Sequence, residues 1–103
     1  MARIIWARPV LPDLEEIAEY IALDKPAAAR KLVQKVFDVV ERLQYFPQSG
    51  RIPPELSESA YREIIVGPCR VFYRVAGEDV FILHVMRGER ELRKFILDEQ
   101  LDN

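Results

Sequence analysis

The chain has 103 residues, half of them hydrophobic, which is enough to bury the core of one domain over residues 1–103 and leaves no room for a second. A formal net charge of -2 at pH 7 excludes a field that would by itself hold a polyanion, and a single cysteine excludes an internal disulfide. No segment is apolar over enough residues to be a signal-peptide core or a membrane span, so we expect a cytoplasmic domain with no membrane contact.

The first predicted element is a β-strand over residues 2–7, an apolar run rich in β-branched and aromatic side chains. A helix is predicted to open at Pro12 and Asp13, because proline is tolerated in a first turn and the helix dipole favours a carboxylate there. The apolar residues that follow recur with helical spacing and form one face, namely Leu14, Ile17, Ala18 and Ile21. The opposite face of this helix is acidic.

A second, longer helix is predicted from Ala27 up to the breaker Pro47, with Asp24 as its N-cap and Pro26 in its first turn. The connection between the two helices is so short that they must form an antiparallel hairpin, which would cover one face of a sheet. Ion pairs across the hairpin are expected to be weak if exposed. They would join the acidic first helix to three outward cations, Arg30, Lys31 and Lys35.

Residues 61–87 contain three β-rich runs separated by turn residues, and they predict a three-stranded antiparallel meander. In the middle strand, residues 69–75, side chains alternate between the two faces. A core face is predicted for Cys69, Val71, Tyr73 and Val75, and an arginine-bearing face for Arg70, Phe72 and Arg74.

The last strand, residues 80–86, is apolar on both faces except at His84, as is typical of a strand covered above and below. Alternation places His84 on the face of Val80, Ile82 and Met86. A short closing helix is predicted over residues 89–97. The fold class is therefore α+β: an antiparallel sheet of the N-terminal strand and the meander, packed on one face by the helical hairpin, with a short C-terminal helix.

Few residues suggest catalysis. A cysteine within an apolar strand, as Cys69 is, usually acts as a small hydrophobe, and a lone His84 there is more often a hydrogen-bonded core residue than a base. One cysteine and one histidine cannot supply a tetrahedral metal site, so we expect neither a metal nor another cofactor. The remaining candidates are arginines that would suit a phosphodiester backbone or a carboxylate-rich partner if they converged, namely Arg70, Arg74, Arg87 and Arg90.

In order along the chain, these features resemble the RelE/ParE superfamily of bacterial type II toxins. The resemblance covers nearly the whole chain, including the strand, the helical hairpin and the Phe-Pro-Gln-Ser-Gly-Arg loop that ends at Arg51. It also rests on Arg70 three residues before Tyr73, and on Gly88 with Arg90 after the last strand. The ordered combination carries the specificity, since each piece alone is weak.

The resemblance implies a toxin that a cognate antitoxin holds inactive, within a toxin–antitoxin assembly that can be of higher order. RelE-like members cut messenger RNA in the ribosome, and ParE-like members poison DNA gyrase. Arg70 and Arg90 match arginines of the nucleases, but Glu63 stands where lysines are expected, and Phe95 and Ile96 where a tyrosine is wanted. The pattern favours a ParE-like gyrase inhibitor that is not an enzyme, with a RelE-like nuclease as the alternative and a non-toxic structural module as an alternative of another class.

Two sets of binding residues follow from this interpretation. The target is expected to contact the cations Arg70, Arg87, Arg90, Arg93 and Lys94. The antitoxin is expected to contact aromatic residues that lie off, or at the end of, the main helical stripes, namely Tyr20, Phe37 and Phe46.

Overall fold

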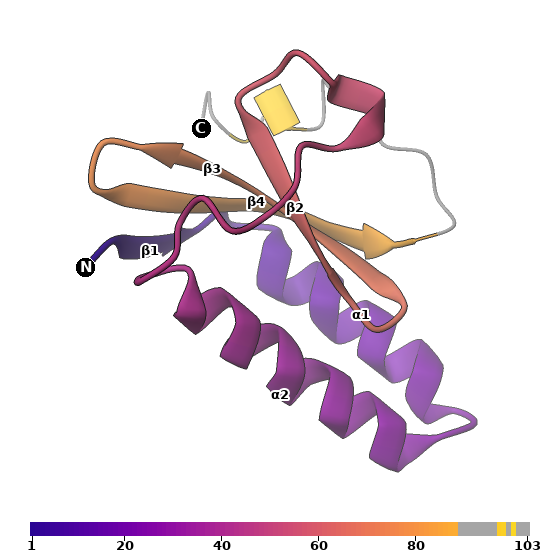
Figure 1. Ribbon diagram of the computed structural model, residues 1–103. Coiled ribbons are helices and arrows are strands. Elements are labelled where there is room, and N and C mark those ends of the chain that lie inside the picture. Colours follow the sequence, from indigo (N-terminus) through magenta and orange to yellow (C-terminus); the bar gives the residue numbers. More distant parts are fainter. Residues whose placement is uncertain (89–96, 99, 101–103) are drawn as a thin grey trace.

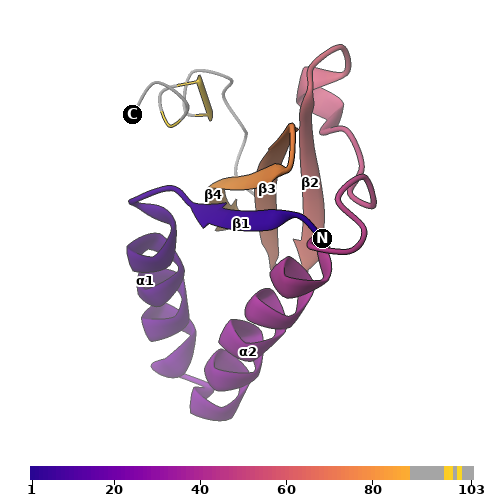
Figure 2. The same ribbon diagram turned by 90° about the vertical axis from the view of Figure 1, so that its left-hand side faces the viewer.

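The structure is a computed structural model that describes residues 1–88, 97, 98 and 100 (Figure 1). A four-stranded sheet forms one layer, and two helices form a second layer on one of its faces (Figures 1 and 2). The predicted α+β fold is confirmed, although the predicted closing helix over residues 89–97 lies almost entirely outside the described residues. In chain order the elements are β1 (Arg3–Trp6), α1 (Val10–Ala22), α2 (Pro26–Arg42), the 3-10 turn η1 (Pro54–Leu56), β2 (Tyr61–Val66), β3 (Cys69–Ala76) and β4 (Asp79–Arg87).

The strands lie in the order β1-β4-β3-β2, with antiparallel pairing inside the meander. The prediction of an antiparallel sheet is wrong for the first strand, because β1 runs parallel to β4. Parallel neighbours need a long crossover connection, and here both helices and the β2–β3 hairpin lie between the two strands in the chain. Each hairpin of the meander turns at a glycine in the left-handed region, Gly67 with φ 55° and Gly77 with φ 61°.

The helical hairpin differs from its prediction at its ends. α1 begins two residues earlier, so Pro12 lies inside its first turn. The predicted cap at Asp24 is wrong: α2 has Lys25 at its N-cap, and no side chain caps it. Asp24 instead lies in the turn that closes α1, where its backbone N–H donates to the Ile21 carbonyl over 3.1 Å. α2 ends at Arg42, well before Pro47. None of the described helices is long and apolar enough to span a membrane.

The main hydrophobic core lies between the helices and the sheet. Each helix contributes its single apolar stripe, and each fully buried aliphatic side chain adds roughly 1.5–3 kcal/mol of transfer free energy. The buried members are Val10, Leu14, Leu32, Val36, Val40, Leu43, Val66, Cys69, Val71, Tyr73, Val80, Ile82 and Val85. The predicted core face of the middle strand is thus correct, with Val75 packed at its margin.

The other face of the sheet carries a second, smaller core, which the sequence did not predict. Its buried members are Tyr61, Phe72, Leu83, Met86 and Leu97. Leu97 packs in this second core, on the side of the sheet away from the helices. The expectation of an open arginine-bearing face is therefore wrong around Phe72, which is completely buried.

A β-bulge in β4 explains why simple alternation fails in this strand. Phe72 pairs with His84 but Tyr73 pairs with Ile82, so Leu83 is an extra residue in β4. Beyond the bulge the two faces exchange, and Val85 faces the helices. The predicted grouping of His84 with Ile82 is consequently wrong, and its ring stacks on Phe72, with 6.1 Å between the ring centroids.

Candidate functional site

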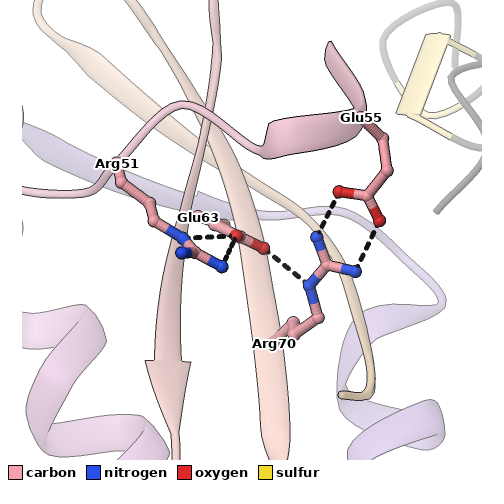
Figure 3. A network of polar contacts seen from close by, with 4 residues as sticks. All are labelled: Arg51, Glu55, Glu63 and Arg70. Atoms are coloured by element: carbon pink, nitrogen blue, oxygen red, sulfur yellow. Dashed lines mark hydrogen bonds and ion pairs between the residues drawn. The ribbon is translucent and has the colours of Figure 1, made fainter. Parts of the chain in front are cut away.

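Four charged side chains of alternating sign form a connected network on the face of the sheet away from the helices (Figure 3). Glu63 accepts hydrogen bonds from both arginines: its Oε1 lies 2.7 Å from Arg51 Nε, and its Oε2 lies 2.7 Å from Arg70 Nε. Arg70 also donates to both carboxylate oxygens of Glu55, at 2.8 Å from Nη1 and 2.7 Å from Nη2. Two cations and two anions therefore neutralise one another.

The backbone brings these four residues together. Arg51 and Glu63 exchange both backbone hydrogen bonds, at 3.0 and 2.7 Å, so the loop after α2 lies along the outer edge of β2. Arg70 lies on β3, diagonally across the sheet from Glu63, because its direct partner on β2 is Ile65. The turn η1 then places Glu55 over the guanidinium of Arg70. The network thus joins the loop, β2 and β3.

Because the network is buried, a ligand cannot readily replace one of its side chains as the partner of another. The side chain of Glu63 is completely buried, and Arg70 is only 6% exposed. The hydrogen bond to Glu55 raises the pKa of Arg70, burial opposes that effect, and Glu63 raises the pKa further. Separating such a pair would leave an uncompensated charge out of water, which is strongly destabilising. The prediction that Arg70 contacts a target stays untested, and this arrangement argues against it.

The convergence considered for the four arginines fails at Arg87. Arg87 pairs with Cys69, whose side chain faces the helices, so Arg87 lies on the opposite face of the sheet from Arg70. Its guanidinium lies 4.9 Å from the ring centroid of Tyr20 on α1, within reach of a cation–π interaction. The inversion at the Leu83 bulge is the physical reason. The other predicted target contacts, Arg90, Arg93 and Lys94, lie outside the described residues.

A groove of about 590 Å³ runs between α1 and α2, and it contains one of the three residues predicted to contact an antitoxin. Phe37 lines the groove, is 41% exposed, and packs its ring 5.4 Å from that of Trp6. Tyr20 instead packs against Arg87, and Phe46 follows the end of α2, 63% exposed. Neither lines the groove. The three residues are therefore on separate surfaces.

The sequence reasoning missed the small residues of this groove. Ala18 and Ala22 on α1 face Ala29 on α2, where side chains no longer than a methyl group leave an open channel. The available signal was the run of alanines on the two neighbouring helices, but of Ala18 and Ala22 only Ala18 was considered, as part of the apolar face of the first helix. Glu55 was also missed, because nothing in the local sequence indicates that this loop residue reaches a buried arginine.

The Gly50-Arg51 motif is explained by packing. The backbone N–H of Gly50 donates to the hydroxyl of Tyr73 over 2.8 Å, and that hydroxyl donates to the Pro47 carbonyl over 2.9 Å. A Cβ at position 50 would lie 2.5 Å from the Tyr73 hydroxyl and 2.8 Å from the Glu63 carbonyl, so the close approach requires glycine. These contacts hold the loop after α2 against the core.

We expect Gly50→Ala to lower the free energy of unfolding by about 1–3 kcal/mol, as is typical of an overpacked site. The atoms it would displace include backbone, which cannot move away cheaply. Urea unfolding measures the change, with Gly77→Ala as a comparison, since a Cβ there meets no atom within 4 Å and the cost is one of φ alone. A Gly50→Ala protein as stable as the wild type would show that the close packing of Gly50 against Tyr73 does not constrain the loop.

Comparison with known proteins identifies the family. Residues 4–92 match the family described as ParE toxin of type II toxin-antitoxin system, parDE. The chain belongs to this family. The toxin is 35% identical over 95 residues to Toxin ParE3 of Caulobacter vibrioides, covering 89% of this chain and 92% of that protein. It is 31% identical over 91 residues to Toxin RelE2 of the same bacterium, covering 87% of this chain and 99% of that protein.

A solved structure agrees with the sequence relatives. The chain described as Chromosomal ParDE TA system from P. aeruginosa superposes on this toxin with a TM-score of 0.70 at 28% identity, covering 86% of this chain and 98% of that chain. The resemblance to RelE/ParE toxins is thereby confirmed. Relatives are named both ParE and RelE, so the names alone do not choose between the two targets.

Proposed function

We propose that this toxin acts by inhibiting DNA gyrase and that a cognate antitoxin neutralises it in the cytoplasm. The observation that carries the choice of target is the neutral network around Arg70. A nuclease would need this arginine for the scissile phosphate, whose negative charge it would have to stabilise in the transition state. Here two carboxylates already occupy its guanidinium, and an incoming phosphate would meet them first.

Proton transfer is the second requirement of RNA cleavage, and a tyrosine and the histidine on the same face of the sheet as Arg70 are poorly suited to it. Burial, with a hydrogen bond to Asp98, raises the pKa of Tyr61 to about 12. Burial lowers the pKa of His84, with Asp13 opposing, and its ring stacks on Phe72. A general acid or base works best with a pKa near the operating pH and a free path to the reacting atom. The titration properties of Tyr61 and His84 therefore favour a binding protein over a nuclease.

The target surface in this proposal begins at Arg87. Arg87 is half-buried at the end of β4, and its guanidinium lies over the ring of Tyr20. The cations that follow it in the sequence, Arg90, Arg93 and Lys94, extend the proposed surface. Because several side chains share the binding energy of such a surface, single substitutions are expected to weaken gyrase inhibition gradually and not to abolish it.

The antitoxin is proposed to bind the groove between α1 and α2. Its length and apolar lining suit an amphipathic helix anchored by side chains at i, i+3, i+4 and i+7. The P. aeruginosa structure is described as a ParDE system, which supports an antitoxin partner for this chain too. Assemblies of more than one toxin with several antitoxins are compatible with a site confined to the helical layer.

A supercoiling assay with purified gyrase tests the proposal. We expect the toxin to inhibit supercoiling of relaxed plasmid, the antitoxin to relieve the inhibition, and Arg87→Ala to raise the half-inhibitory concentration without abolishing inhibition. Arg42→Ala is the control, because it removes an exposed arginine at the end of α2, outside the proposed target surface. Gyrase that stays fully active at toxin concentrations that arrest growth in cells would contradict the proposal.

The likeness to Toxin RelE2 makes ribosome-dependent cleavage of messenger RNA the second candidate. Under that function Arg70 and Arg90 would contact the phosphate, and either alanine variant would abolish cleavage. A non-toxic module is the remaining alternative. Induction of this chain alone in a bacterium distinguishes it, since a toxin arrests growth and a module does not.

A further inference from the structure

The groove between α1 and α2 has walls of opposite charge. Glu15 and Glu19 line it from α1, one helical turn apart, and Arg30 lines it from α2. All three are exposed. The floor between the walls is apolar and includes Leu14, Ala18, Ala22, Ala29 and Val33.

Within the described part of the toxin, none of these three side chains forms an ion pair. Its ion pairs are the four-residue network and one pair between Arg3 and Asp79, and none of them crosses the helical hairpin. The cross-hairpin pairing expected from the sequence is therefore absent among residues 1–88. Unpaired charges along the rim of an apolar groove favour a partner of complementary charge and disfavour one of like charge.

We propose that the groove accepts an amphipathic helix of the antitoxin whose apolar stripe is flanked by basic residues on one side and acidic residues on the other. The basic flank lies against Glu15 and Glu19, and the acidic flank lies against Arg30. This inference rests on the proposed antitoxin site and adds the chemistry of its occupant. It also fixes the direction of the bound helix, because turning the helix end to end in the groove would exchange its flanks and bring like charges together.

Charge reversal on one wall is the direct test. The probe is the antitoxin purified from the reading frame beside the toxin's own, titrated against the intact toxin by calorimetry at low and physiological salt. We expect Glu15→Lys with Glu19→Lys to weaken binding by at least about tenfold at low salt, and by less at higher salt, because salt screens exposed pairs. Glu16→Lys with Glu41→Lys changes the net charge equally at exposed positions outside the groove, and it should leave the affinity within about threefold of wild type.

A compensating variant completes the test. Replacing the basic flank of the antitoxin helix with glutamates should restore binding to the Glu15→Lys, Glu19→Lys toxin and weaken binding to the wild type. Equal effects of the groove pair and the control pair would overturn the inference while leaving the antitoxin proposal standing, provided that the wild type binds and an apolar groove variant such as Phe37→Asp does not. A wild-type toxin with no affinity for this antitoxin would overturn both.

Discussion

Glu63→Ala is expected to lower the free energy of unfolding by about 3–5 kcal/mol, because it leaves the buried guanidinium of Arg70 with one of its two carboxylates missing. Arg51 would lose its partner at the same time, although it is more exposed and contributes less. The backbone bridge between residues 51 and 63 would remain, so the loss should be energetic rather than a change of fold.

Urea unfolding at pH 7, followed by circular dichroism, measures this effect. Glu58→Ala is the control, since it removes an exposed glutamate from the same connection and should change stability by less than about 0.5 kcal/mol. A second variant separates charge from packing: Glu63→Leu with Arg70→Met removes both buried charges and should recover most of the loss. A Glu63→Ala protein with wild-type stability would show that the network is not held together in solution.

The second large effect is expected at the groove. Phe37→Asp should weaken antitoxin binding by roughly 30-fold or more, because it replaces a half-exposed aromatic anchor by a charge at an interface, where hot-spot truncations cost about 2 kcal/mol or more. The residue lies on the helical layer, away from the end of β4, so toxicity should persist. A bacterium that carries this variant should therefore stop growing even when the antitoxin is co-expressed.

Phe46→Asp is the matched control for this prediction. It changes the same residue type to the same charge at a more exposed position that does not line the groove. Its antitoxin affinity should stay close to that of the wild type, although the sequence alone had placed it among the contacts. Thermal unfolding of both variants checks that neither has lost the fold. If Phe46→Asp alone escaped the antitoxin, the partner would bind around the end of α2 instead.

Much of the fold follows from local signals that the sequence displays openly. The apolar stripe of α2, the glycine turns at Gly67 and Gly77, and the alternation of β3 each depend on neighbours in the chain. β4 is different, since its residues are apolar on both faces and a run without alternation cannot reveal a bulge. The extra residue Leu83 is therefore invisible in the sequence, and so is its consequence, that Arg87 lies on the opposite face of the sheet from Arg70.

The candidate site was harder to predict for a related reason. Glu63 was recognised as a departure from the nuclease pattern, but its effect depends on Glu55 and Arg51, which reach it only through the path of the loop after α2. Ion pairs between a loop and a strand leave no periodic mark in a sequence. The predicted antitoxin contacts likewise do not form one surface. Tyr20 packs against Arg87, a contact between α1 and β4 that helical spacing alone does not reveal.

The choice between the two targets is tested most directly in one bacterial culture in which the toxin is induced. Plasmid from that culture gives the degree of negative supercoiling, and its RNA gives the 5′ ends of cut transcripts. Because Glu55 and Glu63 already pair with Arg70, we expect negative supercoiling to fall within the time of growth arrest while transcripts on ribosomes stay intact. Transcripts cut at ribosomes in the wild type, with supercoiling unchanged, would contradict this expectation.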